Sequence, residues 1–361
     1  MESLRVAHFK SPYLPLSQAF IYDLLRVQKQ GVHFLFTDRV QNLSDFPWRP
    51  IILFKDYRSL LHLFNGQRLK VIHAHYGQNG IKALRLKRST GLPLITSFHG
   101  EDITARPAQD PHYRELLSEL FAEGDLFIVA DHHLKEMAMH WGCPEAKLRL
   151  LPASVDLEQF RYRPHVYDTT GPLSILSVGR LVEKKGMDTL IEAVRCVNEA
   201  GSATDLTIIG DGELKEALEA QIQRAGLSGR VKLVGSKSRD QVIQALQNAD
   251  LFVLASRTAI SGDQDGQPLA VVEAMAIGVP VLSTFHAGIP ELVHDRVSGC
   301  LVPPGDAGAL ARRILEYQQS PDLWRPYLGA ARKTVERHHD LREQVNRLYR
   351  LYEELAMNKG G

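Results

Sequence analysis

Two carboxylates beside a predicted helix start mark residues 263–291 as the stretch of the chain most suited to chemistry. Asp265 precedes the helix, and Glu273 lies eight positions later, inside it. The free N–H groups of a helix N-terminus can bind phosphate. A carboxylate one to two turns further along can accept hydrogen bonds from hydroxyls, such as those of a ribose. The stretch therefore predicts a ligand that carries phosphate and hydroxyls, although two solvated acids on an ordinary helix–strand unit explain it equally well.

The elements around these carboxylates are predicted from turn formers and apolar runs. Pro268 suits the first helical position, because its missing N–H would be unbonded there anyway. Gly278 and Pro280 are expected to end the helix. The apolar run 279–283 is typical of a buried parallel strand.

Two cations flank a second loop. Arg180 and Lys185 follow the predicted strand 173–178 and lie on a loop bounded by glycines. Together they can hold a diphosphate, arginine through its planar fork and lysine as a point charge. Solvated surface charges fit the same spacing equally well.

A polar cluster with His99 and Asp102 follows another predicted strand. Open α/β sheets bind ligands beyond the carboxyl ends of their strands. His99 can act on a substrate there, donate a hydrogen bond to it, or bind a nearby backbone group as a structural residue. His73 and His75 alternate along the preceding strand, and we expect at least one of them to be structural. The spacing of these three histidines matches no common zinc site, so we expect no metal.

Gly210 and Gly212 open the loop after the predicted strand 206–209. The loop is similar to a dinucleotide fingerprint, but Lys215 stands where the third glycine belongs. It also follows the second strand of its half rather than the first. The signal for NAD is therefore weak, and the chain has neither a P-loop nor a Gly-x-Ser-x-Gly elbow.

Composition indicates an ordinary globular protein of two domains. The chain has 361 residues, 44% of them hydrophobic and 24% charged, and a net charge of +1. This balance favours neither nucleic acid nor an acidic membrane as a partner. Three scattered cysteines fit reduced thiols of the cytosol. No apolar run reaches the ~18–20 residues of a membrane-spanning helix, so we expect a cytoplasmic protein, with peripheral attachment to the membrane left open.

Strands and helices alternate along the whole chain, which predicts doubly wound parallel sheets. Ser17 is expected to cap the helix after a first loop, and 38–65 to hold helices and loops. Residues 160–172 lack apolar periodicity and are the expected linker between domains. Residues 321–358 are expected to be helical. The predicted strands are 4–9, 32–37, 71–77, 94–98, 126–130, 148–151, 173–178, 206–209, 231–234, 251–255 and 279–283, with a strand and turn at 299–306.

The motifs of the chain, in their order, resemble those of the retaining GT-B glycosyltransferases of the group-four type. The C-terminal half carries SVGRLVEKKGMDTLIEAV, IIGDGELKEAL, VKLVG, ADLFVLAS, DGQPLAVVEAMAIGVPVLSTFHAGIPELV and GCLVPPGD in the family's order and spacing. IHAHYG, TSFHGED and LLPASVDLEQF match more loosely. The acidic loop 256–266 and the loop 286–291 resemble the bacterial exopolysaccharide (colanic-acid-like) branch.

The resemblance implies a GT-B fold, in which two Rossmann-like domains face a cleft. Residues 1–165 would form the acceptor-side domain, 166–335 the nucleotide-sugar donor domain, and 336–361 a helix that returns to the first domain. It implies retaining transfer of a sugar from a nucleotide-diphosphate donor to a saccharide or lipid-linked saccharide, in bacterial surface polysaccharide synthesis. Fixed cations and a helix N-terminus can stabilise the leaving group, so neither a metal nor another cofactor is expected.

The resemblance also implies roles for single residues. The catalytic residues would be His99, Asp265, Arg180 and Lys185; the donor-binding residues Gly210, Gly212, Gly266, Gln267, Leu269, Ala270 and Glu273; and the acceptor-side residues Ser17 and Asp102. Asp265 departs from the pattern, because the family has Glu at the first position of Glu-x7-Glu. Asp is shorter by one methylene, about 1.5 Å of reach. Either the loop moves in, a water bridges, or the donor sugar differs.

Other functions fit the same residues. A nucleotide-sugar epimerase or a phosphorylase of similar architecture is the nearest alternative among enzymes. A catalytically silent sugar-nucleotide binding protein is the alternative of another class, and the departure at Asp265 keeps it open. An NAD oxidoreductase is disfavoured by the incomplete glycine pattern.

Overall fold

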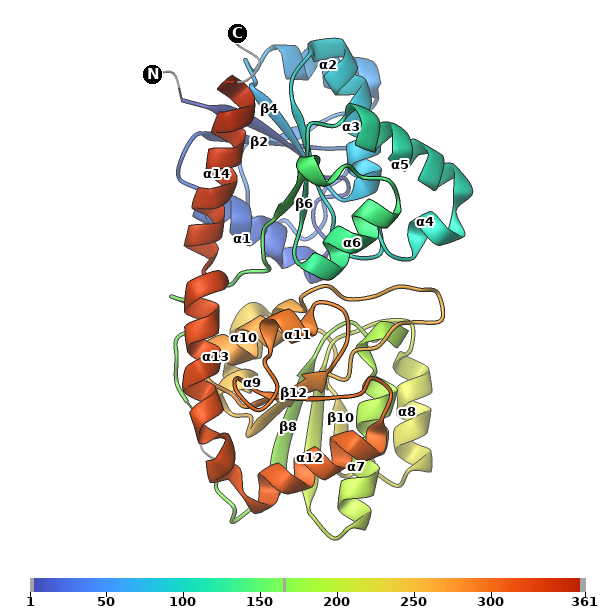
Figure 1. Cartoon of the computed structure of the whole chain (residues 1–361), viewed down its shortest axis with the longest axis vertical. Coiled ribbons are helices and arrows are strands. Elements are labelled where there is room, and N and C mark those ends of the chain that lie inside the picture. The colour runs from blue at the N-terminus through green and yellow to red at the C-terminus, as the bar shows by residue number, and fades with distance from the viewer. Residues whose placement is uncertain (1–2, 165–166, 358–361) are drawn as a thin grey trace. The chain divides into compact units, whose positions relative to one another are not determined.

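A computed structural model describes residues 3–164 and 167–357 of the chain (Figure 1). The chain forms two compact units. The first unit comprises Met1–Pro152 and Leu341–Gly361, and the second comprises Ala153–Asp340. The chain therefore passes between the units twice, after Pro152 and after Asp340.

The first unit contains a sheet of seven parallel strands among the described residues, in the order β3-β2-β1-β4-β5-β6-β7. Their near-continuous apolar sequences suit strands that are covered on both faces. The strands are β1 Arg5–Phe9, β2 Val32–Thr37, β3 Ile51–Leu53, β4 Val71–His75, β5 Leu94–Ser97, β6 Leu126–Val129 and β7 Leu148–Leu150.

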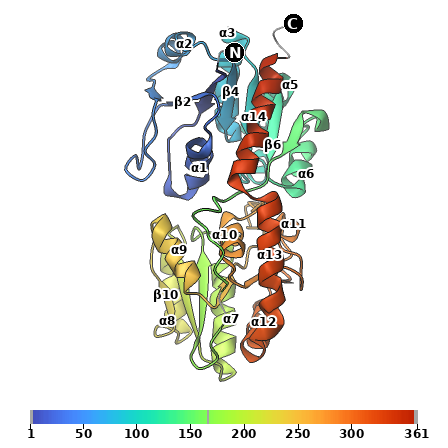
Figure 2. The same ribbon diagram turned by 90° about the vertical axis from the view of Figure 1, so that its left-hand side faces the viewer.

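Helices cover both faces of this sheet. The helices are α1 Ala19–Val27, α2 Tyr57–Asn65, α3 Gly77–Thr90, α4 Arg106–Gln109, α5 Pro111–Glu123, α6 His132–His140 and α14 Leu341–Met357. Alternate strand residues divide the core: Ala7 and Ile72 pack in one cluster with α3 and α5, and Val6 and Val71 pack in another with α14. Figure 2 shows α14 lying beside β4. The last helix of the chain thus completes the core of the first unit.

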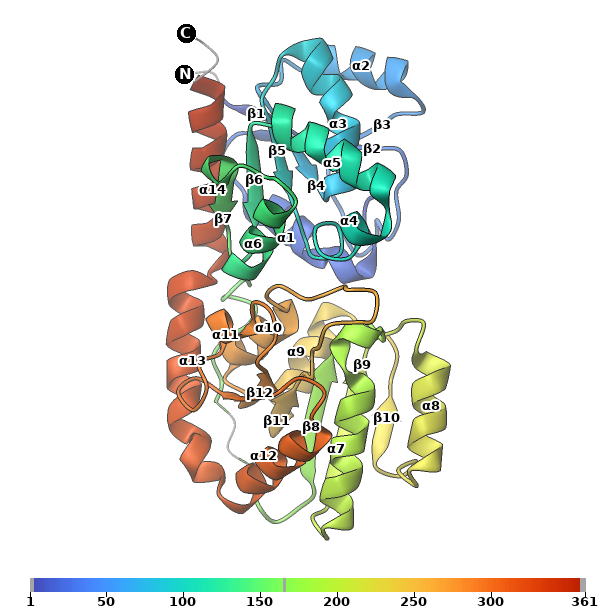
Figure 3. The same cartoon turned by 45° about the vertical axis from the view of Figure 1, so that its right-hand side comes forward.

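The second unit contains a sheet of six parallel strands among the described residues, in the order β10-β9-β8-β11-β12-β13 (Figure 3). Its core is one apolar cluster shared by strands and helices. The strands are β8 Leu173–Val178, β9 Thr204–Ile209, β10 Val231–Leu233, β11 Leu251–Val253, β12 Val281–Thr284 and β13 Cys300–Val302. The helices are α7 Met187–Glu199, α8 Lys215–Arg224, α9 Arg239–Gln247, α10 Leu269–Ile277, α11 Ile289–Leu292, α12 Ala307–Gln319 and α13 Arg325–His338.

The predicted α/β class is confirmed as two doubly wound parallel sheets, and strands 32–37 and 173–178 are confirmed at both ends. The prediction for 38–65 missed the short edge strand β3. The predicted linker 160–172 includes residues 165–166, which lie outside the described residues. Phe160 and Tyr167 on either side of them are buried in the core of the second unit.

Two predicted helix starts are wrong in detail. Ser17 lies inside a 3-10 turn, Leu16–Gln18, and does not cap α1, because a bond from the Gln18 amide to the Pro15 carbonyl already closes that turn. Pro268 precedes α10 as its N-cap instead of occupying the first helical position, since its ψ of 120° is extended.

None of the helices in the described ranges is long and apolar enough to cross a membrane.

Candidate functional site

The loop after β8 holds two adjacent lysines in a tight turn. Glu183–Lys185 form a 3-10 turn, and Gly186 follows in the left-handed conformation with φ 61°. A Cβ at Gly186 would lie 1.9 Å from the carbonyl oxygen of Ala255, so only glycine allows this loop to approach the end of β11 so closely. The Arg257 amide also donates to the carbonyl of Lys184, at 2.9 Å. The turn is thereby fixed against the neighbouring strand.

The carboxylate of Asp265 binds both lysines. Nζ of Lys185 lies 2.7 Å from Oδ2 of Asp265, and Nζ of Lys184 lies 3.5 Å from Oδ1. Lys184 is also 2.9 Å from Asp263, and Ser256 donates to Oδ2 of Asp265 at 3.1 Å. The shorter side chain of Asp265 therefore lies in a buried network of ion pairs and hydrogen bonds.

Burial and charge shift the protonation of this pair in defined directions. Burial lowers the pKa of the Lys185 amine, and the nearby Asp265 opposes that shift. Burial raises the pKa of the Asp265 carboxyl, but Lys185 and Lys184 outweigh it and hold that pKa below its usual range. Arg180, exposed on the same loop, adds to the positive charge around Lys185. The loop after β8 thus presents three cations, and fixed carboxylates pair with two of them, Lys184 and Lys185.

The glycines of the loop after β9 allow it to pack against the loop after β8. A Cβ at Gly210 would lie 1.8 Å from the carbonyl oxygen of Gly179, and one at Gly212 would lie 2.5 Å from that of Leu181. The Leu181 amide in turn donates to the carbonyl of Asp211, at 2.9 Å. Close backbone approach therefore explains both glycines within the protein itself.

The N-terminus of α10 follows Asp265 directly. Its N-cap makes no side-chain hydrogen bond, and α10 begins with Leu269 and Ala270, whose amides come before the first bonds within a helix. Glu273 lies further along α10 and is half-buried. Oε1 of Gln267 accepts a hydrogen bond from the Ala153 amide, at 3.2 Å. Helix start, lysines and carboxylates therefore lie within one region of the second unit.

Asp102 ties together two loops of the first unit. Its Oδ1 accepts from the His99 amide at 2.9 Å, and its Oδ2 accepts from the Gly77 amide at 2.8 Å. Tyr113 donates its hydroxyl to the carbonyl of Asp102 at 2.9 Å. Burial raises the pKa of the Asp102 carboxyl to about 6, although the two amides oppose the shift. Both carboxylate oxygens therefore hold the loop after β5 against the start of α3.

His99 lies among rings at the end of β5. Its ring centroid is 4.6 Å from that of Tyr76, 4.9 Å from that of Phe20 and 6.1 Å from that of His75. Burial, together with the charge of Lys10, lowers the pKa of His99 to about 3, so the imidazole is neutral. Its Nε2 is buried, with no hydrogen-bond partner among the described residues. Ser17, by contrast, is exposed in its 3-10 turn.

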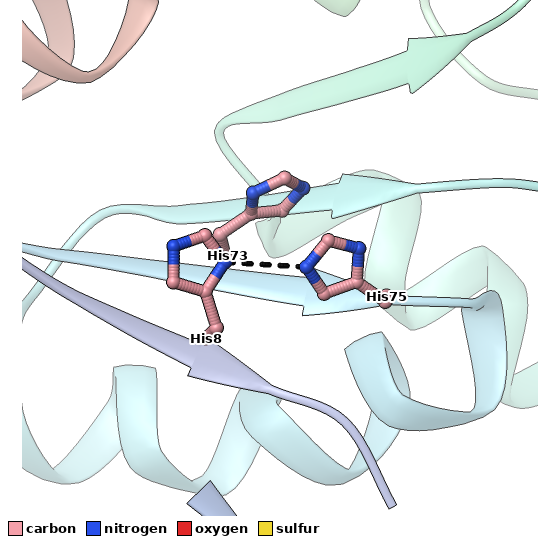
Figure 4. Close-up of side chains that lie close together, drawn as sticks. All are labelled: His8, His73 and His75. Atoms are coloured by element: carbon pink, nitrogen blue, oxygen red, sulfur yellow. Dashed lines mark hydrogen bonds between the residues drawn. The ribbon is translucent and has the colours of Figure 1, made fainter. Parts of the chain in front are cut away.

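Sequence reasoning missed a histidine cluster. His8, His73 and His75 each offer a nitrogen within 4.8 Å of the others (Figure 4). His8 on β1 pairs in register with His73 on β4, which brings together residues far apart in the sequence. The alternation of His73 and His75 was visible in the sequence, but the neighbour in β1 depends on the strand order.

A metal ion would have to compete with bonds that this cluster already makes. His73 is 2.7 Å from the Tyr352 hydroxyl through Nδ1 and 2.7 Å from the Ser97 hydroxyl through Nε2. His8 is bonded through both nitrogens, to His75 and His33. Among the ring nitrogens of His8, His73 and His75, only Nδ1 of His75 has no hydrogen-bond partner within the described residues. The donor set is thus that of a hydrogen-bonded network.

The structure brings the predicted residues together in two groups. In the second unit, Asp265 contacts Lys185, and Arg180 lies on the same loop. In the first unit, Asp102 holds the backbone of His99. The group in the first unit includes a neutral histidine. The group in the second unit has a buried ion pair beside a helix N-terminus, and such an N-terminus is suited to binding phosphate.

Comparison with known proteins identifies both halves of the chain. The family description "Glycosyl transferases group 1" matches residues 163–334, and "Glycosyltransferase Family 4" matches residues 24–159. The chain is 40% identical over 282 residues to WcaL of Escherichia coli, named as a candidate colanic acid biosynthesis glycosyltransferase, covering 77% of this chain and 68% of WcaL. It is 37% identical over 286 residues to the amylovoran biosynthesis glycosyltransferase AmsK of Erwinia amylovora, covering 78% and 69%.

Solved structures share the fold. The Anabaena protein HepE, crystallised with UDP, superposes with a TM-score of 0.82 at 17% identity, covering 97% of this chain and all of that one (100%). Sucrose-phosphate synthase from Thermosynechococcus elongatus superposes with a TM-score of 0.80 at 19% identity, covering 99% and 100%. The architecture of two parallel sheets is therefore shared with these GT-B proteins.

Proposed function

The chain belongs to the glycosyl transferases group 1, a family of retaining glycosyltransferases, and we propose that it transfers a sugar from a nucleotide-diphosphate donor to a saccharide or lipid-linked saccharide in exopolysaccharide synthesis. The names of WcaL and AmsK support the pathway class, and HepE in complex with UDP supports the donor class. The observation that carries the proposal is the mostly buried Lys185 on the loop after β8, held 2.7 Å from Asp265 beside the start of α10.

The second unit is proposed to bind the donor nucleotide. Lys185 and Arg180 stabilise the diphosphate, and the amides of Leu269 and Ala270 at the start of α10 bind its oxygens. Glu273 accepts hydrogen bonds from the ribose hydroxyls. Negative charge grows on the diphosphate as the sugar leaves, and fixed positive charge in a water-poor site stabilises that change. Gly210 and Gly212 leave their loop without side chains near the base.

The first unit is proposed to contribute His99 to the sugar. A neutral imidazole donates or accepts one hydrogen bond without adding charge beside the reacting carbon. Asp102 acts through the backbone, because its carboxylate is occupied by the amides of His99 and Gly77. The retaining route on the donor face requires no protein nucleophile, so the residues have only to bind, orient and neutralise charge.

A donor screen tests this function. UDP-, GDP- and ADP-sugars are added separately and the thermal stability is measured, because a ligand at a hundred times its Kd stabilises by about 2.7 kcal/mol. We expect one nucleotide class to raise the melting temperature, and its sugar then to appear on a saccharide acceptor with the anomeric configuration retained. Failure of every nucleotide sugar to bind would contradict the proposal.

One observation favours a second function. Asp265 neutralises Lys185, which weakens the positive field that a leaving diphosphate needs. A catalytically silent sugar-nucleotide binding protein would tolerate that loss. It would bind the donor in a calorimeter and show neither hydrolysis nor transfer against a panel of acceptors.

A further inference from the structure

Three buried histidines form a hydrogen-bonded chain across the sheet of the first unit. Nε2 of His33 lies 2.7 Å from the carbonyl oxygen of Gln30, and Nδ1 of His33 lies 3.0 Å from Nε2 of His8. Nδ1 of His8 lies 3.2 Å from Nε2 of His75. The histidines come from the neighbouring strands β2, β1 and β4, so the strand order creates the chain.

The Gln30 carbonyl fixes which nitrogen carries each proton. A carbonyl oxygen only accepts, so Nε2 of His33 donates, and Nδ1 of a neutral His33 accepts. His8 must then donate from Nε2 and accept at Nδ1, and His75 must donate from Nε2. Burial lowers the pKa of all three residues, so each imidazole is neutral near pH 7.

The series of hydrogen-bonded histidines ends at a ring nitrogen of His75 whose lone pair is unbonded. Nδ1 of His75 is the remaining acceptor, buried and without a partner among the described residues. Figure 4 shows this nitrogen on the side of the ring away from His8. His75 is the last residue of β4, and the carboxyl edge of a parallel sheet is where such folds bind ligands. A buried acceptor left unsatisfied is unfavourable, and a hydroxyl that donates to it removes that cost.

We propose that the chain from Gln30 through His33 and His8 fixes His75 as a hydrogen-bond acceptor for a sugar hydroxyl. His33 and His8 are positioning residues, and His75 is the binding residue. That the hydroxyl belongs to a sugar rests on the proposed transferase function. The fixed tautomer of His75 is independent of that function.

The surroundings of His75 select a neutral hydroxyl. An anion has no proton to donate to Nδ1, and the positive charge of Lys10, which acts on His75 and His99, disfavours a cation. The His99 ring stacks beside His75 at an interplanar angle of 14°, and its buried Nε2 also has no partner. The His99 ring in turn packs against the rings of Tyr76 and Phe20. A few polar atoms among apolar ring faces are typical of a site for a small neutral ligand.

The tautomer is tested by NMR on the full chain with nitrogen-15 histidine. We expect ring protons on Nε2 of His33, His8 and His75, and scalar couplings across both N–H···N hydrogen bonds. A proton on Nδ1 of His75 near neutral pH would overturn the proposal, without any variant having to fold.

A substitution of His33, at the far end of the hydrogen-bonded histidines, tests whether the tautomer of His75 depends on them. His33→Phe removes the fixed acceptor of His8, so we expect His75 to populate both tautomers. His73→Gln is the matched control. His73 is bonded to Tyr352 and Ser97 and takes no part in the hydrogen bonds that join His33, His8 and His75. Equal changes at His75 in both variants would reduce the effect to general packing and overturn the proposal.

The ligand is tested with UDP-glucose and GDP-mannose as probes. We expect the Nδ1 resonance of His75 to move with the sugar nucleotide that binds. His75→Phe should raise the KM for that donor or its acceptor about tenfold, with kcat less changed, as loss of one hydrogen bond predicts. His75→Asn, which offers an amide oxygen near the position of Nδ1, should restore most of the affinity.

The outcomes separate this inference from the proposed function. If calorimetry finds no binding of either nucleotide sugar to the wild type, the donor assignment fails and the sugar ligand fails with it. If a donor binds and turns over while Nδ1 of His75 does not respond, a water occupies the acceptor and only this inference fails. Chelator-treated protein is also titrated with Zn²⁺. Binding of one equivalent, with loss of the scalar couplings across the N–H···N hydrogen bonds, would identify the histidine cluster as a metal site and overturn the inference.

Discussion

Nζ of Lys185 lies 2.7 Å from Oδ2 of Asp265, so the lysine proposed to neutralise the leaving group already has a counterion. Asp265 stands at the position where the family pattern has Glu. The shorter side chain reaches both lysines of the preceding loop and accepts from Ser256. This network gives the Asp265 carboxylate a role in positioning the two lysines, which is separate from the three explanations for the shorter side chain.

Asp265→Asn is expected to destabilise the second unit. Removal of one partner from a buried ion pair leaves the other charge uncompensated, which costs about 3–5 kcal/mol. Urea unfolding would measure this loss, and transfer should fall at least tenfold. Asp265→Glu keeps the charge and should lose less than half as much stability. Glu219→Gln, on an exposed face of α8, is the control. Equal stability of the Asn variant and the wild type would contradict the role of the pair.

Lys185→Met is expected to lower transfer by about two to three orders of magnitude, a typical effect of losing one electrostatic stabiliser of the leaving charge. The methionine keeps the apolar length of the side chain, and Asp265 keeps Lys184 and Ser256 as partners. The measurements are kcat and the melting temperature. Lys232→Met, on the exposed position of β10, controls for the loss of a charge. Unchanged turnover would remove Lys185 from the mechanism.

Gly210→Ala is expected to disrupt the second unit. The new Cβ would lie 1.8 Å from the carbonyl oxygen of Gly179, which is backbone and cannot rotate away. We expect a loss of more than about 3 kcal/mol, in the range of severe overpacking. Gly226→Ala is the matched control, with a φ of +68° and no atom within 4 Å of its Cβ, and should cost only about 1 kcal/mol. Comparable chemical-denaturation midpoints for the two variants would contradict the close approach.

Asp102→Asn is expected to loosen the loop that carries His99. An amide offers one oxygen, so one of the two N–H groups of Gly77 and His99 loses its acceptor, at a cost of about 1–3 kcal/mol. Amide exchange at these two positions measures the effect. We expect amide exchange to become faster at His99 or Gly77. If the exchange rate rises at neither amide, the carboxylate does not hold the loop.

The first unit is expected to lose stability as the pH falls. Burial lowers the pKa of His8, His33, His73, His75 and His99, so the unfolded chain binds protons below about pH 6.5 that the folded unit does not. Each such proton lowers the free energy of unfolding by up to about 1.4 kcal/mol per pH unit. Asp102 acts oppositely, since its raised pKa of about 6 gives stability that is lost as the pH rises through that value.

Hydrogen exchange of peptides from the two units measures this pH dependence within one sample. Protection in β1 and β4 should fall between neutral pH and pH 5 by much more than protection in β8 and β9, once the intrinsic exchange rate is corrected. Equal losses in both units would contradict the histidine origin.

Local sequence signals predicted the strands well where apolar runs were long. β2 and β8 are six-residue apolar strands, and both ends of each were predicted. β3 was missed because three residues, Ile51–Leu53, lie at the sheet edge among aromatic residues that also fit a helix. Ser17 was misread because the 3-10 turn Leu16–Gln18 runs directly into α1, and no local pattern distinguishes a serine inside that turn from the N-cap of the helix that follows.

The candidate site was predicted in its residues but not in its bonds. Glycine-bounded loops after strands marked Arg180 and Lys185, since the carboxyl ends of parallel strands meet at one edge. The contact of Lys185 with Asp265 joins residues 80 positions apart, and no periodicity encodes it. His8 was missed for the same reason, because its partners are set by the order β2-β1-β4.

The path of α14 has a consequence for the order in which the protein is made. The sheet of the first unit is synthesised first, but Leu348 and Tyr352 of α14 complete its core and Tyr352 bonds to His73. These residues leave the ribosome only after the whole second unit. The histidine-bearing face therefore waits uncovered while about two hundred residues are added, roughly ten to forty seconds at 5–20 residues per second. In biosynthesis, the unit that begins the chain is the last to be finished.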